Sequence, residues 1–196
     1  QPDVLVLQGA DAGGHGLAAS ASIVSLVPET TDALRAGGFD IPVVAAGGIA
    51  DGRGVAAATV LSAQGVAMGT RFLASPEAKI AKGYQEAVLV ASDGGVNTVR
   101  TRLYDTLRGS KTWPEGYNGR GVVNRSYEER EELGVEENVK KYLKAMEEGD
   151  KAWGVDGRAT TYAGSAVGLV VEVKGAGMIV EEVRGEAIKL LGGHKA

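Results

Sequence analysis

The chain has 196 residues, of which 44% are hydrophobic, and a formal net charge of -4. This composition allows one globular core, but a complete (β/α)8 barrel needs about 250 residues and does not fit. The acidic balance and scattered basic residues exclude nucleic acid and membrane surfaces as expected partners, and the lack of cysteine excludes disulfides, thiolate metal sites and a cysteine nucleophile. No apolar run reaches about 18 residues and no signal peptide opens the chain, so we expect an intracellular, cytoplasmic protein.

Three short apolar runs, each ending in glycine and followed by a helical stretch, make up the first half of the chain. The strands are predicted at residues 4–7, 42–46 and 65–68. The helices are predicted from Pro28 to residue 36, from an N-cap at Asp51 to about residue 64, and after a cap at residues 75–77. Strand, glycine turn and helix in regular succession predict an α/β fold with a parallel sheet.

The second half follows a different pattern. Residues 97–105 alternate as a strand does, and residues 113–121 are a predicted loop because they are rich in Pro and Gly. A charged helix is predicted from 127 to 148, interrupted near Gly134, and a small, apolar stretch follows at 162–170. The final amphipathic helix, 178–191, has these residues predicted to face inward: Ile179, Val183, Ile188 and Leu191.

His15 lies in a glycine-rich loop predicted for residues 8–16, at the carboxyl end of the first strand. Parallel α/β sheets place their active sites at this end. A neutral imidazole can take a proton from carbon, and the flanking glycines let a substrate and a flat cofactor approach the backbone. His15 is therefore the candidate catalytic residue, and the alternative is a histidine that only completes a loop hydrogen bond. The other histidine, His194, lies near the end of the chain and is expected to have no role.

Gly47 and Gly48 end the second predicted strand, and Gly69 and Thr70 end the third. Exposed N–H groups in such turns bind anions, and in many barrels the loops after the last two strands hold a phosphate. The two turns together predict a phosphate-bearing cofactor, and the alternative is a pair of tight turns without a ligand. No metal site is predicted, because no carboxylates and histidines have a matching spacing.

The same motifs carry a resemblance to a known family. The segments 8–16, 45–49 and 68–73 occur in this order in nitronate monooxygenases, formerly called 2-nitropropane dioxygenases. The later segments resemble the fungal-like branch of that family, at residues 100–105, 113–114 and 162–165. The resemblance implies the carboxyl-terminal part of a (β/α)8 TIM barrel. Residues 1–91 would form a half-barrel that carries an FMN phosphate site, and residues 92–196 an insertion or mostly helical cap.

The family implies a function for the site residues. That function is FMN-dependent oxidation of alkyl nitronates or nitroalkanes by molecular oxygen, with His15 as the base at the carbon next to the nitro group. The residues implied to lie around FMN are Gln8, Gly13, Gly14, Gly47, Gly48, Gly69, Thr70 and Ser165. Tyr162 is implied to line the substrate pocket, whereas Ser165 stands where relatives often have Gln or Thr.

Two other functions stay open. Flavin enoyl-acyl carrier protein reductases share the glycine–histidine loop and both phosphate turns, and a half-barrel can also serve as an inactive interaction fragment. The family's amino-terminal half has no counterpart before residue 1, so the chain supplies about three of eight barrel strands. Because an open parallel edge recruits a partner, we expect another chain to supply the amino-terminal half-barrel.

Overall fold

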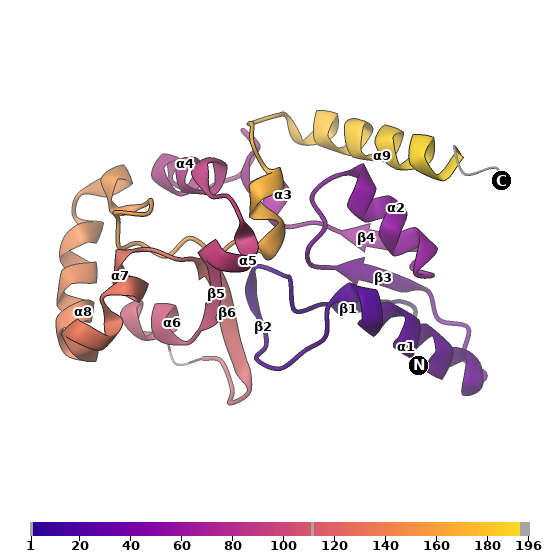
Figure 1. Cartoon of the computed structure of the whole chain (residues 1–196), viewed down its shortest axis with the longest axis horizontal. Helices are drawn as coiled ribbons and strands as arrows, with labels where there is room; N and C mark the ends of the chain where they lie inside the picture. The colour runs from indigo at the N-terminus through magenta and orange to yellow at the C-terminus, as the bar shows by residue number, and fades with distance from the viewer. Residues whose placement is uncertain (1, 111, 193–196) are drawn as a thin grey trace.

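A parallel three-stranded sheet forms the centre of the first half of the chain (Figure 1). The computed structural model describes residues 2–110 and 112–192. The sheet has the order β1–β3–β4, with β1 at Leu5–Gln8, β3 at Val43–Ala46 and β4 at Gly65–Ala67. The three predicted parallel strands are therefore confirmed.

One face of this sheet packs against helices α1 (Ile23–Ala36) and α2 (Gly52–Val60). Leu7 of β1 is aligned with Ala45 of β3, so alternate residues of both strands face the same core. Val27 of α1 is fully buried in that core. Burial of this apolar face contributes most of the free energy that holds the helices on the sheet.

Only one of these two helices begins where the sequence predicts. Helix α2 begins as predicted, with Asp51 accepting hydrogen bonds from the N–H groups of Arg53 and Gly54 at 3.0 and 3.1 Å. Helix α1 begins at Ile23, so the predicted start at Pro28 is wrong and the proline lies inside the helix. Ile23 is buried against the sheet, and this tertiary contact extends the helix beyond its local start signal.

A second, antiparallel sheet joins the two halves of the chain. Strand β6 (Tyr117–Val122) lies between β2 (Gly14–Leu17) and β5 (Thr98–Thr101). The predicted loops at 8–16 and 113–121 are therefore wrong where β2 and β6 form. Glycine in β6 marks close packing, because a Cβ on Gly121 would lie 2.9 Å from the Thr161 carbonyl oxygen.

Short helices surround this second sheet. Residues 97–105 do not form one strand, because β5 is preceded by α5 (Gly94–Asn97) and followed by α6 (Leu103–Leu107). Helix α3 covers Thr70–Leu73 and α4 covers Lys82–Val90.

The predicted helix cap at residues 75–77 is also wrong, because α4 begins only at Lys82. Ser75 Oγ instead donates to the Phe72 carbonyl. The Glu77 carboxylate accepts a hydrogen bond from the N–H of Ala176, a residue distant in sequence. Glu77 therefore accepts a hydrogen bond at the start of the final helix of the chain instead of capping α4.

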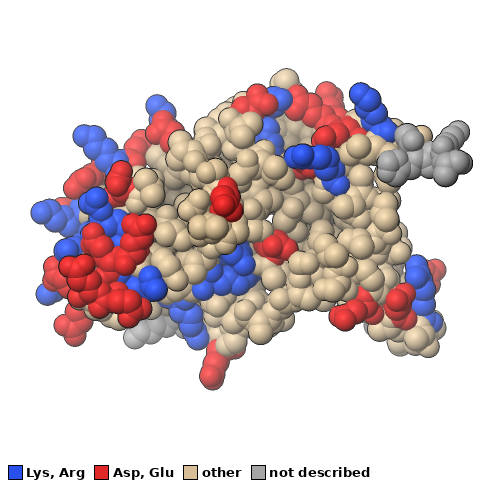
Figure 2. All heavy atoms as spheres, in the orientation of Figure 1, with Lys and Arg blue, Asp and Glu red and all other residues tan. Residues whose placement is uncertain are grey.

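The charged stretch forms α7 (Arg125–Glu128) and α8 (Arg130–Met146), with non-helical angles at Gly134 that confirm the predicted interruption. Figure 2 shows acidic and basic side chains crowded over this end of the molecule, as expected for a solvated face. The 3-10 turns η1 (Gly149–Ala152) and η2 (Ser165–Leu169) follow.

The final helix, α9, runs from Ala176 to Gly192 and lies along α2 (Figure 1). Ile179 and Val183 are buried as predicted. The inward placement predicted for Ile188 and Leu191 is wrong, because these side chains are 59% and 40% exposed. The buried stripe continues through Ala187, which follows Ile179 and Val183 at spacings of four residues. His194 lies outside the described residues.

The antiparallel sheet crosses the predicted boundary between residues 1–91 and 92–196. Strand β2 comes from the first part, and β5 and β6 come from the second. The division into two parts stays a prediction. Within residues 2–110 and 112–192, every helix is too short or too polar to serve as a membrane span.

Candidate active site

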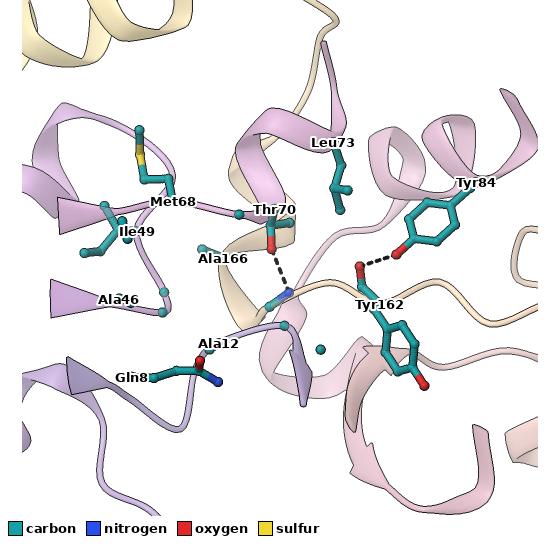
Figure 3. A pocket seen from close by; sticks show the side chains of 17 residues that line it. Gln8, Ala12, Ala46, Ile49, Met68, Thr70, Leu73, Tyr84, Tyr162 and Ala166 are labelled. Atoms are coloured by element: carbon teal, nitrogen blue, oxygen red, sulfur yellow. Dashed lines mark hydrogen bonds between the residues drawn. The ribbon is translucent and has the colours of Figure 1, made fainter. Parts of the chain in front are cut away.

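The carboxyl ends of β1, β3 and β4 open into a cavity of about 440 Å³ (Figure 3). Parallel strands point the same way, so the turns that follow them meet at one end of the sheet. Tyr84 of α4 and the segment from Tyr162 to Ala166 form much of the opposite wall. The predicted site residues that line this cavity are Gln8, Gly13, Gly14, Gly47, Gly48, Gly69, Thr70 and Tyr162.

The glycines of the two turns differ in whether the fold requires them. Gly47 and Gly48 have φ values of 101° and 75°, which residues with a side chain rarely adopt. Gly69 has φ -106°, and a Cβ at this position would have no other atom within 4 Å. The fold does not require glycine at position 69. Open space over its backbone is what a ligand in the cavity would need.

Backbone donors at these turns suit an anion. Within the described part of the chain, the N–H groups of Gly48, Gly69 and Thr70 donate to no backbone carbonyl. Thr70 Oγ1 accepts from the N–H of Gly164 at 2.9 Å, which leaves the hydroxyl hydrogen to be donated (Figure 3). Several N–H groups and a hydroxyl beside an open backbone fit a phosphate group.

His15 lies on β2, with Gly119 of β6 opposite it in register. Its Nε2 atom is 2.8 Å from Oδ1 of Asp105, and both side chains are largely buried, with 12% and 8% of their surfaces exposed. The imidazole stacks on the indole of Trp113, with ring centroids 4.1 Å apart and planes 6° apart. Glycine at 119 permits this arrangement, because a Cβ there would lie 2.6 Å from the Tyr162 ring and 3.5 Å from Nε2.

The Asp105 carboxylate, on α6, connects His15 to Tyr162. The Tyr162 hydroxyl donates to Oδ1 of Asp105 at 3.1 Å, whereas Oδ2 is buried without a hydrogen-bond partner among the described residues. Burial and the neighbouring carboxylate raise the pKa of Tyr162 to about 12. Tyr162 is therefore a hydrogen-bond donor at neutral pH.

Two arginines hold the segment that leads into β2. Arg100 and Arg120 are paired in register on β5 and β6, and both donate to the carbonyl oxygen of Ala10. Arg100 also donates to the carbonyl of Ala12 at 3.1 Å. Burial lowers the pKa of both arginines, and the adjacent Arg120 charge lowers that of Arg100 further. This desolvated pair fixes the loop that precedes the catalytic candidate.

The remaining site residues fall in neighbouring positions. His15 lines a second cavity of about 460 Å³, which shares Gln8 with the first. Gln8 Nε2 donates to the His15 carbonyl at 2.8 Å, so it positions that strand as well as lining both cavities. Ser165 Oγ donates to Asp11 at 2.8 Å, and Ser165 lines a third cavity rather than the first. Its role toward a cofactor stays a prediction.

Sequence reasoning missed the partners of His15. Neither Asp105 nor Trp113 is predicted from the sequence as a partner of His15, and the role of Arg100 in holding the segment before β2 is not predicted either. A lone aspartate on a short helix carries no local signal for a histidine 90 positions away. The described residues contain no group of three His, Cys, Asp or Glu side chains placed to hold a metal ion.

The glycine turns line one cavity, and His15, paired with the buried Asp105, lines a neighbouring cavity that shares Gln8 with it. A ligand site at the carboxyl ends of parallel strands is typical of α/β proteins. The chain belongs to the nitronate monooxygenase family, whose model matches residues 1–182. It is 55% identical over 97% of its length to the nitronate monooxygenase npaC of Metarhizium robertsii, and 46% identical over 94% to a nitronate monooxygenase of Neurospora crassa. It covers 53% and 48% of these proteins, so it spans about half the length of its curated relatives.

Two solved structures resemble the fold of this chain. FabK from Thermotoga maritima matches with a TM-score of 0.72 and 28% identity, over 97% of this chain and 56% of that one. Nitroalkane oxidase from Streptomyces ansochromogenes matches with a TM-score of 0.71 and 26% identity, over 97% and 53%. The chain therefore shares its fold with two solved structures, and it covers just over half the length of each.

Proposed function

We propose that the chain is the part of an FMN-dependent nitronate monooxygenase that holds the flavin phosphate and supplies the base His15. The observation that carries this proposal is the position of His15, paired with Asp105 beside the glycine-lined cavity. The names of the relatives support nitronates or nitroalkanes as substrates. Molecular oxygen is the second substrate.

The phosphate of FMN would bind to the N–H groups of Gly48, Gly69 and Thr70 and to the Thr70 hydroxyl. Gln8 and the Gly13–Gly14 backbone line the same cavity and would lie beside the rest of the cofactor. When bound, FMN would supply the redox chemistry that couples oxidation of the substrate to reduction of oxygen.

The protein's own contribution to the chemistry is proton transfer and orientation. A nitroalkane loses a proton from the carbon that bears the nitro group, and the imidazole of His15 takes it. The electron pair left on carbon moves onto the nitro oxygens, which gives the nitronate anion. A preformed nitronate has already lost this proton and needs no base.

Comparing turnover of the neutral nitroalkane with turnover of the nitronate tests the role of His15. For His15→Asn, turnover of the neutral nitroalkane should fall by about 10²- to 10⁴-fold, the usual cost of removing a general base, whereas turnover of the nitronate should fall much less. Steady-state rates are measured for both forms after flavin content has been matched. Equal losses on both would contradict the base assignment, and no loss on either would contradict any catalytic role.

We also propose that residues 1–91 complete a (β/α)8 barrel with strands from another chain, with residues 92–196 as its cap. Strands β1 and β4 are the edges of the described parallel sheet, and their unpaired backbone groups favour such pairing. The subunit composition of the flavin-containing species, measured by native mass spectrometry, tests this. Flavin bound by the 196-residue chain alone would contradict it.

Enoyl reduction is the second candidate function, because flavin enoyl reductases share the glycine–histidine loop and both phosphate turns. The two functions differ in their electron donor. Rapid bleaching of the flavin by reduced nicotinamide, without a nitro compound, would favour the reductase.

A further inference from the structure

Asp105 determines which nitrogen of the neutral His15 ring carries the hydrogen. An ionised carboxylate can only accept hydrogen bonds, so Nε2, at 2.8 Å from Oδ1, must carry a hydrogen. In the neutral imidazole the other nitrogen, Nδ1, then holds the lone pair. The Tyr162 hydroxyl donates to the same Oδ1 atom and helps to hold the carboxylate in this orientation.

Nδ1 is also the accessible nitrogen. It forms no hydrogen bond with the described residues, and it is not among their fully buried unpaired atoms. His15 lines the 460 Å³ cavity, whose wall includes Arg100, Trp113 and Tyr117. With Nε2 turned toward Asp105, Nδ1 is the ring nitrogen left to meet a substrate.

The surroundings also accommodate the product of proton uptake. Once Nδ1 gains a proton, the ring is a cation that touches a carboxylate at its edge and the Trp113 indole on its face. Both contacts are attractive for a cation, and the stacked geometry limits rotation of the ring. Rotation would exchange the two nitrogens.

We infer that Asp105 is the positioning residue of this site, holding His15 as the Nε2–H tautomer so that Nδ1 accepts the substrate proton. Asp105 does not itself contact the substrate, and Tyr162 supports it through its hydroxyl group. This inference rests on the proposed function for the proton transfer, but the tautomer is a property of the protein itself.

Nitrogen NMR of the flavin-loaded protein measures the tautomer without any turnover. The ¹⁵N shifts of neutral His15, assigned by their loss in His15→Asn, should show the proton on Nε2. In Asp105→Asn, whose amide can either accept or donate, this preference should be lost. Tyr162→Phe should keep the tautomer, because the carboxylate remains, and so should Asp156→Asn, which removes an exposed carboxylate that has no contact with His15. A proton on Nδ1 in the wild type would overturn the inference.

Kinetics separate positioning from a merely structural role. With nitroalkane, kcat of Asp105→Asn should fall by about 10- to 10⁴-fold, the upper figure being the loss seen when the aspartate of a serine-protease triad is replaced and the wrong tautomer results. KM should change little, and the nitronate should lose much less activity. Asp156→Asn should keep wild-type rates. Equal flavin content and circular dichroism in both variants establish that the fold is intact.

The outcomes distinguish this inference from the proposed function. A wild-type Nε2–H tautomer that is lost in Asp105→Asn, together with no oxidation of nitro compounds, would retain the role of Asp105 in setting the tautomer and reject the proposed function. Nitroalkane activity that depends on His15 but is unchanged in Asp105→Asn would reject this inference alone.

Discussion

Gly69 has ordinary backbone angles and lines the cavity, and a Cβ there would have no other atom within 4 Å. Gly48 differs, because its φ of 75° and the 2.9 Å approach of a Cβ to Asp11 make it a requirement of the fold. Substitutions at these two glycines therefore report on different properties. A substitution at Gly69 probes ligand binding alone. A substitution at Gly48 probes ligand binding and the stability of the turn together.

Gly69→Val should abolish FMN binding while the free energy of unfolding of the apoprotein stays within about 0.5 kcal/mol of wild type, the usual range for changes that disturb no packing. Flavin absorbance of the barrel completed with its partner strands, and chemical denaturation of the apoprotein, measure the two quantities. Gly48→Val should also empty the site, but with an added strain of about 1 to 2 kcal/mol.

Gly185 on α9 provides the control, because a Cβ there also meets no atom within 4 Å but lies outside the cavity. Gly185→Val should retain stoichiometric flavin. Stoichiometric FMN in either Gly69→Val or Gly48→Val would show that the phosphate binds elsewhere.

At the scale of elements, α2 is held at its start by two carboxylates. Asp51 caps it from within the local sequence, and Glu186 of α9 accepts from the N–H of Gly52 at 2.8 Å. A Cβ on Gly52 would lie 2.5 Å from Glu186 Cβ, so the helices are in close contact there. Local capping and tertiary packing thus act on the same turn.

Asp51→Ala should lower the free energy of unfolding by about 1 kcal/mol, because it leaves the N–H groups of Arg53 and Gly54 without their acceptor. Denaturant melts of wild type and variant measure this. Asp51→Asn keeps an acceptor oxygen and should lose much less. If Ala and Asn cost the same, the ion pair with Arg53, not the cap, carries the effect.

At the scale of the whole molecule, buried tyrosines connect the cavity wall to the second sheet. Tyr84 Oη donates to the Tyr162 carbonyl at 2.7 Å, and Tyr104 Oη donates to the Val122 carbonyl at 2.6 Å. Burial raises the pKa of Tyr84 from 10.0 to about 12, and that of Tyr104 also rises because of burial. These hydroxyls stay protonated in the folded state when the unfolded chain has begun to ionise.

Stability should therefore fall with alkali. A pKa raised on folding means that the folded state holds its protons more tightly, so the stabilisation is complete below pH 10.0 and is lost as the pH rises toward about 12. As the pH rises through this interval, the free energy of unfolding of Tyr84→Phe should increase relative to that of wild type by on the order of 2 kcal/mol. Denaturant melts at successive pH values measure the difference. A difference that does not change with pH would contradict this account.

Much of the parallel region could be predicted because its signals are local. Buried strands appear as apolar runs, the cap of α2 as Asp51, and the turns as Gly47–Gly48 and Gly69–Thr70. Burial and backbone angle act on each residue separately, so a few neighbouring residue types suffice to indicate them. The interruption near Gly134 was predictable for the same reason.

The sequence by itself determined the parallel strands, their glycine turns and the family to which the chain belongs. Only the tertiary structure decided that His15 lies on a strand, that this strand pairs with β6, and that Asp105 and Trp113 enclose the imidazole. It also decided that Ala187, not Ile188, continues the buried stripe of α9. The physical reason is that pairing and side-chain contact between distant segments depend on where the folded chain places them, which no local periodicity records.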